Sequence, residues 1–306
     1  MNIKDRFDKG EVFLMEGALG ERLKREFDLD ISGEVAMASL IDETKGRTSL
    51  RLLWLQYLAI AEKYGLPFMA TTPTRRANRE RVTKSGQPAT IIRDNVEFLR
   101  EILSEIEHPA YLGGLMGCRG DAYTGEGNLS EKEAVGFHQW QADEFAKAGA
   151  DYLFAGIMPT LPEAIGMAKA MANTGLPYII SFTIKPDGCL IDNTPIYRAI
   201  ETIDAKIKNK PICYMTNCIH PRFVISALDQ SFNRCIQNRF KGVQANTAAL
   251  EYCEMDGATR LKATSNPHEL SVYMQTLKEQ FNLQVFGGCC GTDHLYMEEI
   301  AKVISV

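Results

Sequence analysis

Residues 152–183, YLFAGIMPTLPEAIGMAKAMANTGLPYIISFT, carry the pattern that decides the fold. An apolar run over residues 152–156 precedes a stretch with helical periodicity over residues 162–175, and a second apolar run follows over residues 178–183. The helical stretch ends in glycine, as helices often do. Two strands separated by a helix are typical of parallel strands joined by a right-handed crossover.

The same pattern extends in both directions along the chain. Eight apolar runs come ahead of helix-like stretches: residues 11–16, 66–71, 110–115, 152–156, 178–183, 212–216, 241–244 and 284–286. Eight such units close into a (β/α)8 TIM barrel, and we predict this α/β fold in preference to an open doubly wound sheet. No linker divides the pattern, so we predict a single domain over residues 1–306. Residues 17–65 leave room for an extra loop or helix.

The composition is that of an ordinary globular protein, since 45% of the 306 residues are hydrophobic and 24% are charged. The net charge is -5 and no long basic block occurs, which argues against a nucleic-acid partner. The N-terminus lacks the apolar core of a signal peptide, and no apolar stretch reaches the roughly 18 residues of a membrane span. We therefore expect a cytoplasmic protein without membrane contact. Its eight cysteines would then be reduced thiols or metal ligands.

Three of these cysteines are predicted to meet at one end of the barrel. Residues 285–293, VFGGCCGTD, place Cys289 and Cys290 at the end of the last predicted strand, and residues 212–218, ICYMTNC, place Cys218 just past the sixth. The C-terminal strand ends share the face on which barrel enzymes build their active sites. Zinc accepts thiolate ligands, and three protein ligands with an open fourth position are typical of a catalytic zinc site. A fourth ligand, from His220 or His294, would close that site.

The type of ligand also narrows the reaction. Three thiolates more than cancel the charge of a zinc ion, so a bound water would be activated poorly, whereas a bound thiol would lose its proton and stay nucleophilic. Alkyl transfer to sulfur suits such a site better than zinc-dependent hydrolysis does. A non-catalytic zinc- or thiol-binding protein is another alternative. So is simple packing of buried cysteines, the role that we expect for Cys189, Cys213, Cys235 and Cys253.

Four segments stand out as motifs: GGCCGT at residues 287–292, TNC at 216–218, LMEGALGERL at 14–23 and LSEKEAVGFHQWQ at 129–141. Together they resemble the zinc-dependent homocysteine S-methyltransferases, over nearly the whole chain. The resemblance implies a TIM barrel with zinc held by Cys218, Cys289 and Cys290. It also implies methyl transfer from a small onium donor, such as S-methylmethionine, to homocysteine or a related small thiol in methionine biosynthesis. A separate corrinoid protein is the alternative source of the methyl group.

The amino-acid pocket of that family is only partly kept. Glu16 stands where the family has an aspartate, and residues 156–159, GIMP, replace a segment that usually begins with glutamate. The carboxylate that would pair with the ammonium of homocysteine is therefore missing from the fourth strand. We expect Glu16, Thr72 and Arg75 to contact the acceptor. An alternative acceptor is a small acidic thiol bound by Arg75 or Arg76, unless both arginines are solvated surface charges.

Overall fold

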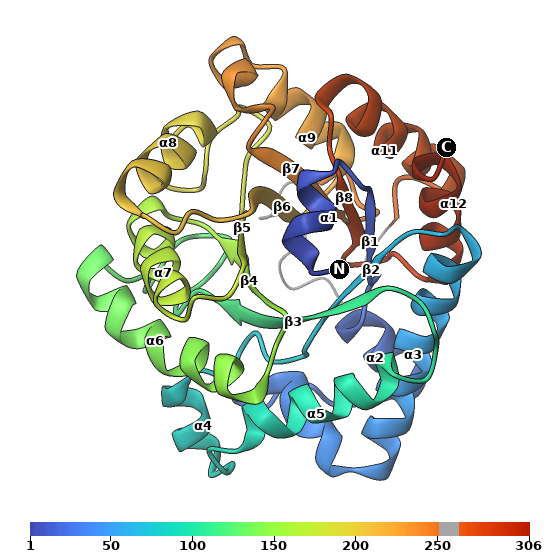
Figure 1. Ribbon diagram of the computed structural model, residues 1–306, viewed down its shortest axis with the longest axis vertical. Helices are drawn as coiled ribbons and strands as arrows, with labels where there is room; N and C mark the ends of the chain where they lie inside the picture. The colour runs from blue at the N-terminus through green and yellow to red at the C-terminus, as the bar shows by residue number, and fades with distance from the viewer. Residues whose placement is uncertain (251–262) are drawn as a thin grey trace.

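The computed structural model describes residues 1–250 and 263–306. Eight parallel strands are hydrogen-bonded in chain order until β8 meets β1, so the barrel closes and the predicted (β/α)8 fold is confirmed (Figure 1). The strands are β1 (Phe13–Met15), β2 (Phe68–Thr71), β3 (Ala110–Gly117), β4 (Tyr152–Met158), β5 (Tyr178–Phe182), β6 (Cys213–Ile219), β7 (Phe240–Ala245) and β8 (Val285–Gly288). Each predicted apolar run overlaps one of them.

Helices surround the barrel (Figure 1). They are α2 (Gly20–Phe27), α3 (Thr44–Lys63), α4 (Arg79–Ser85), α5 (Ile91–Leu103), α6 (Glu131–Ala148), α7 (Leu161–Asn173), α8 (Ile196–Lys206), α9 (Pro221–Leu228), α11 (Pro267–Phe281) and α12 (His294–Ile304), with the 3-10 helices η1 (Ala36–Asp42) and η2 (Ser231–Ile236). Local sequence fixes their ends, as in α6, which starts with a capping box of Ser130 and Glu133 and stops at left-handed Gly149. The extra element predicted within residues 17–65 is present as α2 and η1, ahead of α3.

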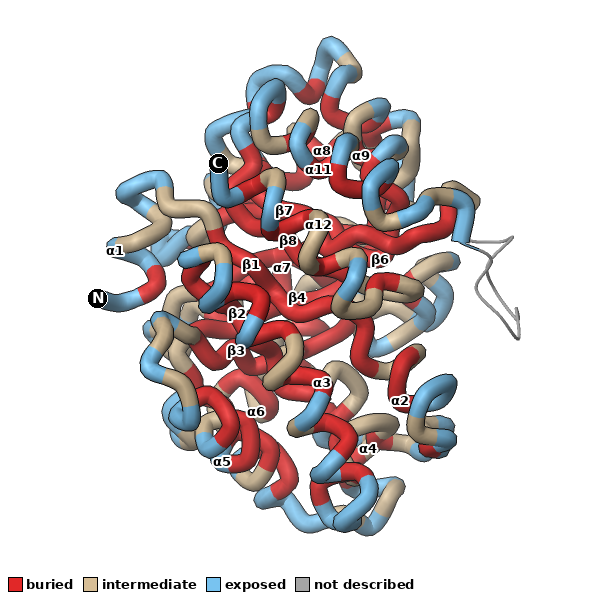
Figure 2. Tube along the Cα trace, turned by 90° about the vertical axis from the view of Figure 1, so that its right-hand side faces the viewer, coloured by how far each residue is buried: buried red, intermediate tan, exposed pale blue. Residues whose placement is uncertain are grey.

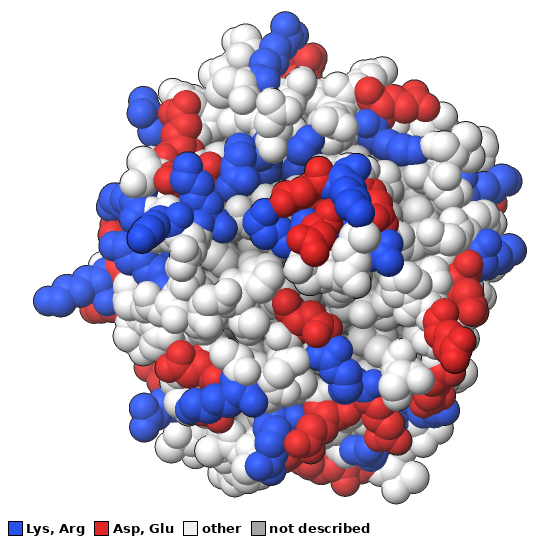
Figure 3. All heavy atoms as spheres, viewed as in Figure 1, with Lys and Arg blue, Asp and Glu red and all other residues white. Residues whose placement is uncertain are grey.

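Helix α1 (Ile3–Asp8) covers the end of the barrel at which the strands begin (Figures 1 and 2). Its Ile3 joins the interior cluster, and Arg6 Nε donates a hydrogen bond of 2.7 Å to the hydroxyl of Tyr111 near the start of β3. Acidic and basic side chains are interspersed on this face (Figure 3). The thiol cluster described below lies at the opposite end, where the strands finish.

The barrel interior is filled by large side chains, so it is a packed core and forms no pore. Tyr152 and Phe154 of β4 lie there together with Phe13 and Met69. Gly113 of β3 makes room for Tyr152, because a Cβ atom at residue 113 would come within 2.3 Å of the tyrosine ring. A larger apolar cluster lies between the strands and the helices (Figure 2). Within the described residues, no helix combines the length and apolarity needed to cross a membrane.

Candidate active site

Three thiols meet where β6 and β8 end. The Sγ atom of Cys290 lies 3.7 Å from that of Cys218 and 3.9 Å from that of Cys289, and all three lie within 4.8 Å of one another. Thiolates arranged tetrahedrally around zinc, at Zn–S distances of about 2.3 Å, would be separated by roughly 3.8 Å. The three cysteines therefore come together as the sequence predicts, and their spacing fits a shared zinc ion.

The backbone of β6 is distorted where it presents Cys218. The pairing register with β7 shifts between Asn217 and Ile219, and Cys218 adopts a left-handed conformation with φ of 63°. Asn246, after β7, donates a side-chain hydrogen bond of 3.1 Å to the carbonyl of Cys218. Left-handed residues other than glycine are uncommon and are often found at functional sites. The bulge and this hydrogen bond turn the thiol toward the other two.

The glycines of GGCCGT each meet a steric need of the turn after β8. A Cβ atom on Gly288 would come within 2.1 Å of the Thr292 hydroxyl, and Gly291 has a φ of 83°. Thr292 Oγ1 donates a hydrogen bond of 2.6 Å to the carbonyl of Cys289, and the Cys289 amide donates to Ala245 of β7 at 2.6 Å. The motif thus specifies a rigid backbone that holds two adjacent thiols.

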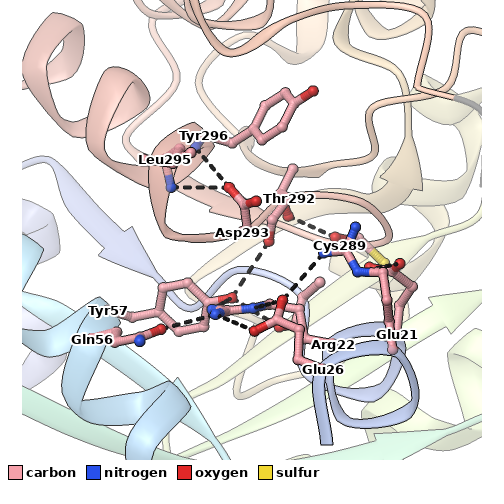
Figure 4. A network of polar contacts seen from close by, with 12 residues as sticks. Glu21, Arg22, Glu26, Gln56, Tyr57, Cys289, Thr292, Asp293, Leu295 and Tyr296 are labelled. Carbon is pink, nitrogen blue, oxygen red and sulfur yellow. Dashed lines mark hydrogen bonds and ion pairs between the residues drawn. The ribbon is translucent and has the colours of Figure 1, made fainter. Parts of the chain in front are cut away.

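A buried polar network ties this turn to α2 and α3 (Figure 4). The hydroxyl of Tyr57, on α3, donates to the carbonyl of Ala18 at 2.8 Å, and the Ala18 amide donates to the Thr292 carbonyl at 2.8 Å. Arg22 of α2 is 2% exposed, donates to Tyr57 at 3.0 Å and forms two hydrogen bonds of 2.8 Å with Glu26. The start of α2 is therefore fixed against the cysteine turn.

The loop after β3 closes one side of the thiol cluster. Its Tyr123 hydroxyl donates a hydrogen bond of 3.2 Å to Cys218 Sγ, and Ala122 packs with Ile157 against the same sulfur. The pKa of Cys218 is lowered chiefly by contacts from the Cys289 and Cys290 thiols, with the Tyr123 hydroxyl acting in the same direction.

Glu163 anchors that loop, a role that sequence reasoning missed. Its carboxylate is fully buried and accepts hydrogen bonds from the backbone amides of Arg119 at 2.7 Å and Leu129 at 3.1 Å. His138 Nε2 lies 3.0 Å from the same carboxylate. Glu163 is at the start of α7, but its partners depend on a loop conformation that no local pattern encodes. His138 and Gln141, which donates to the Thr74 carbonyl, are buried core positions.

The end of β4 carries no carboxylate. Ile157 occupies the position beside Cys218, with a left-handed φ of 48°, and its amide donates a hydrogen bond of 3.0 Å to Asn217 Oδ1. A β-branched residue is unusual in this conformation, so the surrounding packing must hold it there. The sequence departure at residues 156–159 thus places an apolar side chain next to the thiols.

Two of the predicted acceptor contacts have polar partners of their own. The Glu16 carboxylate, at the end of β1, accepts hydrogen bonds from the amide and hydroxyl of Thr71 at 3.1 and 2.5 Å. Burial raises the pKa of Glu16 to about 7, with these hydrogen bonds opposing the rise. The hydroxyl of Thr72 is buried, 2.7 Å from that of Thr74, and accepts from the Leu115 amide. Contact of either residue with a substrate stays a prediction.

Arg75 and Arg76 have different surroundings. The side chain of Arg75 rests against Gly117 at the end of β3, and its charge contributes to the lowered pKa of Cys218. Among the described residues Arg75 has no ion-pair partner. Arg76 is near Arg81 and Glu34, and burial, followed by the charges of Arg81 and Arg75, lowers its pKa.

The histidines that would have closed the site are engaged elsewhere or lie outside the cluster. Both ring nitrogens of His220 have partners, since Nδ1 accepts from the Arg222 amide and Nε2 lies 3.0 Å from the Ser265 hydroxyl. Burial lowers the pKa of His220 to about 4. In the described part of the chain, neither His220 nor His294 belongs to the metal-compatible group.

The other cysteines occupy different places in the fold. Cys213 is buried in the barrel interior, Cys189 lies in a turn after β5 and Cys235 is exposed in η2. Cys253 lies outside the described residues. The packing role predicted for these cysteines therefore suits Cys213 best.

Comparison with known proteins gives a consistent result. A family model described as homocysteine S-methyltransferase matches residues 13–304. Structures of the homocysteine methyltransferase MmuM from Escherichia coli, in metallated and oxidized forms, each align with a TM-score of 0.77 and 20% identity over 97% of both chains. The apo form aligns with a TM-score of 0.69 and 19% identity over the same shares. At these identities the likeness supports the fold alone. Among curated protein sequences, no significant match was found.

Proposed function

The chain belongs to the homocysteine S-methyltransferase family and is an S-methyltransferase, and from this premise we propose that it methylates homocysteine or a related small thiol at a three-cysteine zinc site. One observation carries the proposal, namely the convergence of the Sγ atoms of Cys218, Cys289 and Cys290 within 4.8 Å at the barrel mouth. Three thiolates leave the fourth position of a tetrahedral zinc site for a substrate. A structure of MmuM, which shares the fold, is described as a metallated form, and a metal site in this chain would agree with it.

Zinc would be held by these three thiolates, and when bound it would lower the pKa of the acceptor thiol so that a thiolate is available at neutral pH. The remaining roles belong to the chain's own residues. The Tyr123 hydroxyl orients Cys218 by its hydrogen bond of 3.2 Å, as outer contacts commonly do for metal-ligating side chains. Ile157 and Ala122 pack with Cys218 as an apolar wall, which would limit the access of water to that thiol.

The reaction balances as a single displacement. The acceptor sulfur forms a bond to the methyl carbon while the bond between that carbon and the positively charged donor sulfur breaks. The electron pair stays on the donor sulfur, which becomes a neutral thioether, and the thiol proton passes to solvent. Holding the two sulfurs in line is what a rigid barrel mouth contributes. We propose S-methylmethionine as the donor, because its sulfonium makes the methyl carbon electrophilic and departs as a neutral thioether.

We propose that the polar end of the acceptor lies toward Glu16 and Arg75. Arg75 supplies a guanidinium suited to a carboxylate, and it has no competing ion pair in the described residues. Glu16 supplies a buried oxygen acceptor at the end of β1. Thr72 would support this arrangement by joining β2 to β3, through the hydrogen bond that its hydroxyl accepts from the Leu115 amide at 3.1 Å.

The test is a methyl-transfer assay with zinc-loaded protein, homocysteine and S-methylmethionine that carries a deuterated methyl group. Labelled methionine, detected by mass spectrometry, is the expected product. Reducing conditions are needed because the cysteines of the described residues are free thiols, as expected in the cytoplasm, where we propose the enzyme works. No labelled product from homocysteine or other small thiols, with this donor or a methylated corrinoid protein, would contradict the proposal.

A further inference from the structure

A groove runs beside α4, outside the thiol cluster. One hollow of about 470 Å³ lies between α4 and α6 (Figure 1), and a second of about 280 Å³ lies between α4 and the loop after β3. Glu80 and Lys84 line both hollows, so the two are neighbouring parts of one groove. Together they have the volume of a small-molecule site, which is commonly about 300–1,000 Å³. None of the lining residues belongs to the thiol cluster.

The groove is basic although the protein is acidic. Six charged side chains line it and define what we call the α4 groove: Arg79, Arg81, Lys84, Arg119, Glu34 and Glu80. Four of them are cationic, whereas the chain as a whole carries a net charge of -5. The α4 groove thus has the sign opposite to that of the whole protein, and it favours an anionic ligand.

The two carboxylates do not neutralise the α4 groove. Glu34 is shared by two cations, since its Oε1 lies 2.5 Å from Lys84 Nζ and its Oε2 lies 3.4 Å from Arg81 Nη1. Glu80 lies 3.2 Å from Nε of Arg119. These contacts hold three cationic side chains in place and leave one of their positive charges unbalanced.

Two further arginines add positive charge that no carboxylate balances. Arg79 lines the groove, is exposed and forms no ion pair with any described residue. Arg76 lies near Glu34 and Arg81 without an ion pair in the described part of the chain, and burial, followed by the charges of Arg81 and Arg75, lowers its pKa. An anion in the α4 groove would relieve this repulsion between cations.

Phe137 of α6 gives the larger hollow an aromatic side. The guanidinium carbon of Arg119 lies 6.0 Å from the centre of the Phe137 ring. A Cβ atom on the neighbouring Gly136 would meet no atom of any other segment within 4 Å, so the surface of α6 is open there. A flat ring of a ligand can stack on the aromatic side chain or on the guanidinium, and guanidinium groups bind phosphate oxygens through paired hydrogen bonds.

We propose that the α4 groove binds a phosphate ester that carries an aromatic ring, such as a nucleotide. Arg79, which has no ion pair among the described residues, and Lys84 would meet the phosphate oxygens. Phe137 would hold the ring. This ligand lies outside the proposed methyl transfer, because neither the thiol acceptor nor the sulfonium donor carries a phosphate group.

Calorimetric titration of the zinc-loaded native protein with adenosine monophosphate tests the proposal, because this probe combines a phosphate with an aromatic ring. We expect saturable binding of one molecule per chain, which weakens as the salt concentration rises. Arg79→Gln should weaken this binding by roughly 10- to 100-fold, the size of one hydrogen bond to a charged group. Phe137→Ala should weaken it as well, but should not change the binding of ribose 5-phosphate, the same kind of ester without the ring.

Arg198→Gln is the matched control, since Arg198 on α8 is exposed and lines neither hollow. This variant should bind adenosine monophosphate as the native protein does. The proposal is overturned if the native protein does not bind adenosine monophosphate, or if Arg79→Gln binds it as tightly as Arg198→Gln does. Tricarballylate, a tricarboxylate without a ring, tests the class of ligand. Binding as tight as that of adenosine monophosphate would assign the α4 groove to carboxylates and contradict the phosphate ester.

Discussion

At the ends of β6 and β8, three thiols lie within 4.8 Å of one another and are held by backbone hydrogen bonds, a strand bulge and close-packed glycines. At the ends of β1, β2 and β4, by contrast, most polar side chains bond to one another, and an apolar isoleucine faces the thiols. We call the first region the sulfur half (Tyr123, Cys218, Cys289, Cys290) and the second the recognition half (Glu16, Thr72, Arg75, Ile157). The sulfur half is preorganised for chemistry, whereas the recognition half offers a substrate few free charged groups.

The largest expected effect lies in the sulfur half. In Cys290→Ser, a hydroxyl that stays protonated replaces a thiolate ligand, so we expect less than one zinc per chain and at least about a 100-fold loss of methyl transfer. Zinc content by mass spectrometry and labelled methionine formation check this together. Cys189→Ser, in a turn outside the thiol cluster, is the matched control and should change neither quantity. If both variants lost zinc and methyl transfer to the same extent, Cys290 would have no role that Cys189 lacks.

Glu16 in the recognition half predicts a pH effect on stability. Its pKa rises from about 4.3 in the unfolded chain to about 7 in the folded protein. The folded state therefore holds the proton more tightly, and the resulting stabilisation, complete below about pH 4, is lost as the pH rises through about 7. At about 1.4 kcal/mol per pH unit over this difference of about 2.7 units, the loss totals about 4 kcal/mol, of which roughly two thirds falls between about pH 5 and 8.

Urea unfolding of the zinc-loaded native protein and of zinc-loaded Glu16→Gln, each at about pH 5 and about pH 8, measures this loss of stability. The free energy of unfolding of the native protein should fall relative to that of the variant as the pH rises, because glutamine does not titrate. Parallel curves for the two proteins would mean that Glu16 keeps an ordinary pKa and is ionised throughout.

Glu163 connects the two halves by anchoring the loop that carries Tyr123. Glu163→Gln turns an amide donor toward a backbone amide that needs an acceptor, so we expect a loss of about 2 kcal/mol in the free energy of unfolding. Glu131→Gln is the control, since its partners Lys169 and Lys206 form solvent-accessible ion pairs of lower worth. Urea unfolding at neutral pH compares the two variants. Similar losses would show that Glu163 is no special anchor.

The smallest effect is expected for Tyr123→Phe, which removes the hydroxyl that donates to Cys218 Sγ. We expect zinc to bind about 10-fold more weakly, the lower end of what outer hydrogen bonds contribute. Competition with a chromogenic chelator measures the affinity, with Tyr197→Phe on α8 as the control. An unchanged affinity would mean that the backbone alone holds the three thiols in place and that the Tyr123 hydroxyl contributes nothing to zinc binding.

The sequence allows the two halves to be predicted to different extents. The strands follow from apolar runs, and Cys218, Cys289 and Cys290 follow from their places at strand ends, because parallel strands finish on one face. The left-handed Ile157 and the loop amides bound by Glu163 depend on contacts between distant segments. No local sequence pattern predicts such contacts, so the arrangement of the recognition half could be described only from the structure.

The central claim is that the three-cysteine site works through zinc, and stepwise metal loading tests it most directly. Protein stripped by a chelator under reducing conditions is titrated with zinc, and bound metal and labelled methionine are measured at each step. We predict no methyl transfer in the stripped protein and a linear rise that ends at one zinc per chain. Full activity in metal-free protein, or one bound zinc that persists in Cys290→Ser, would contradict the account.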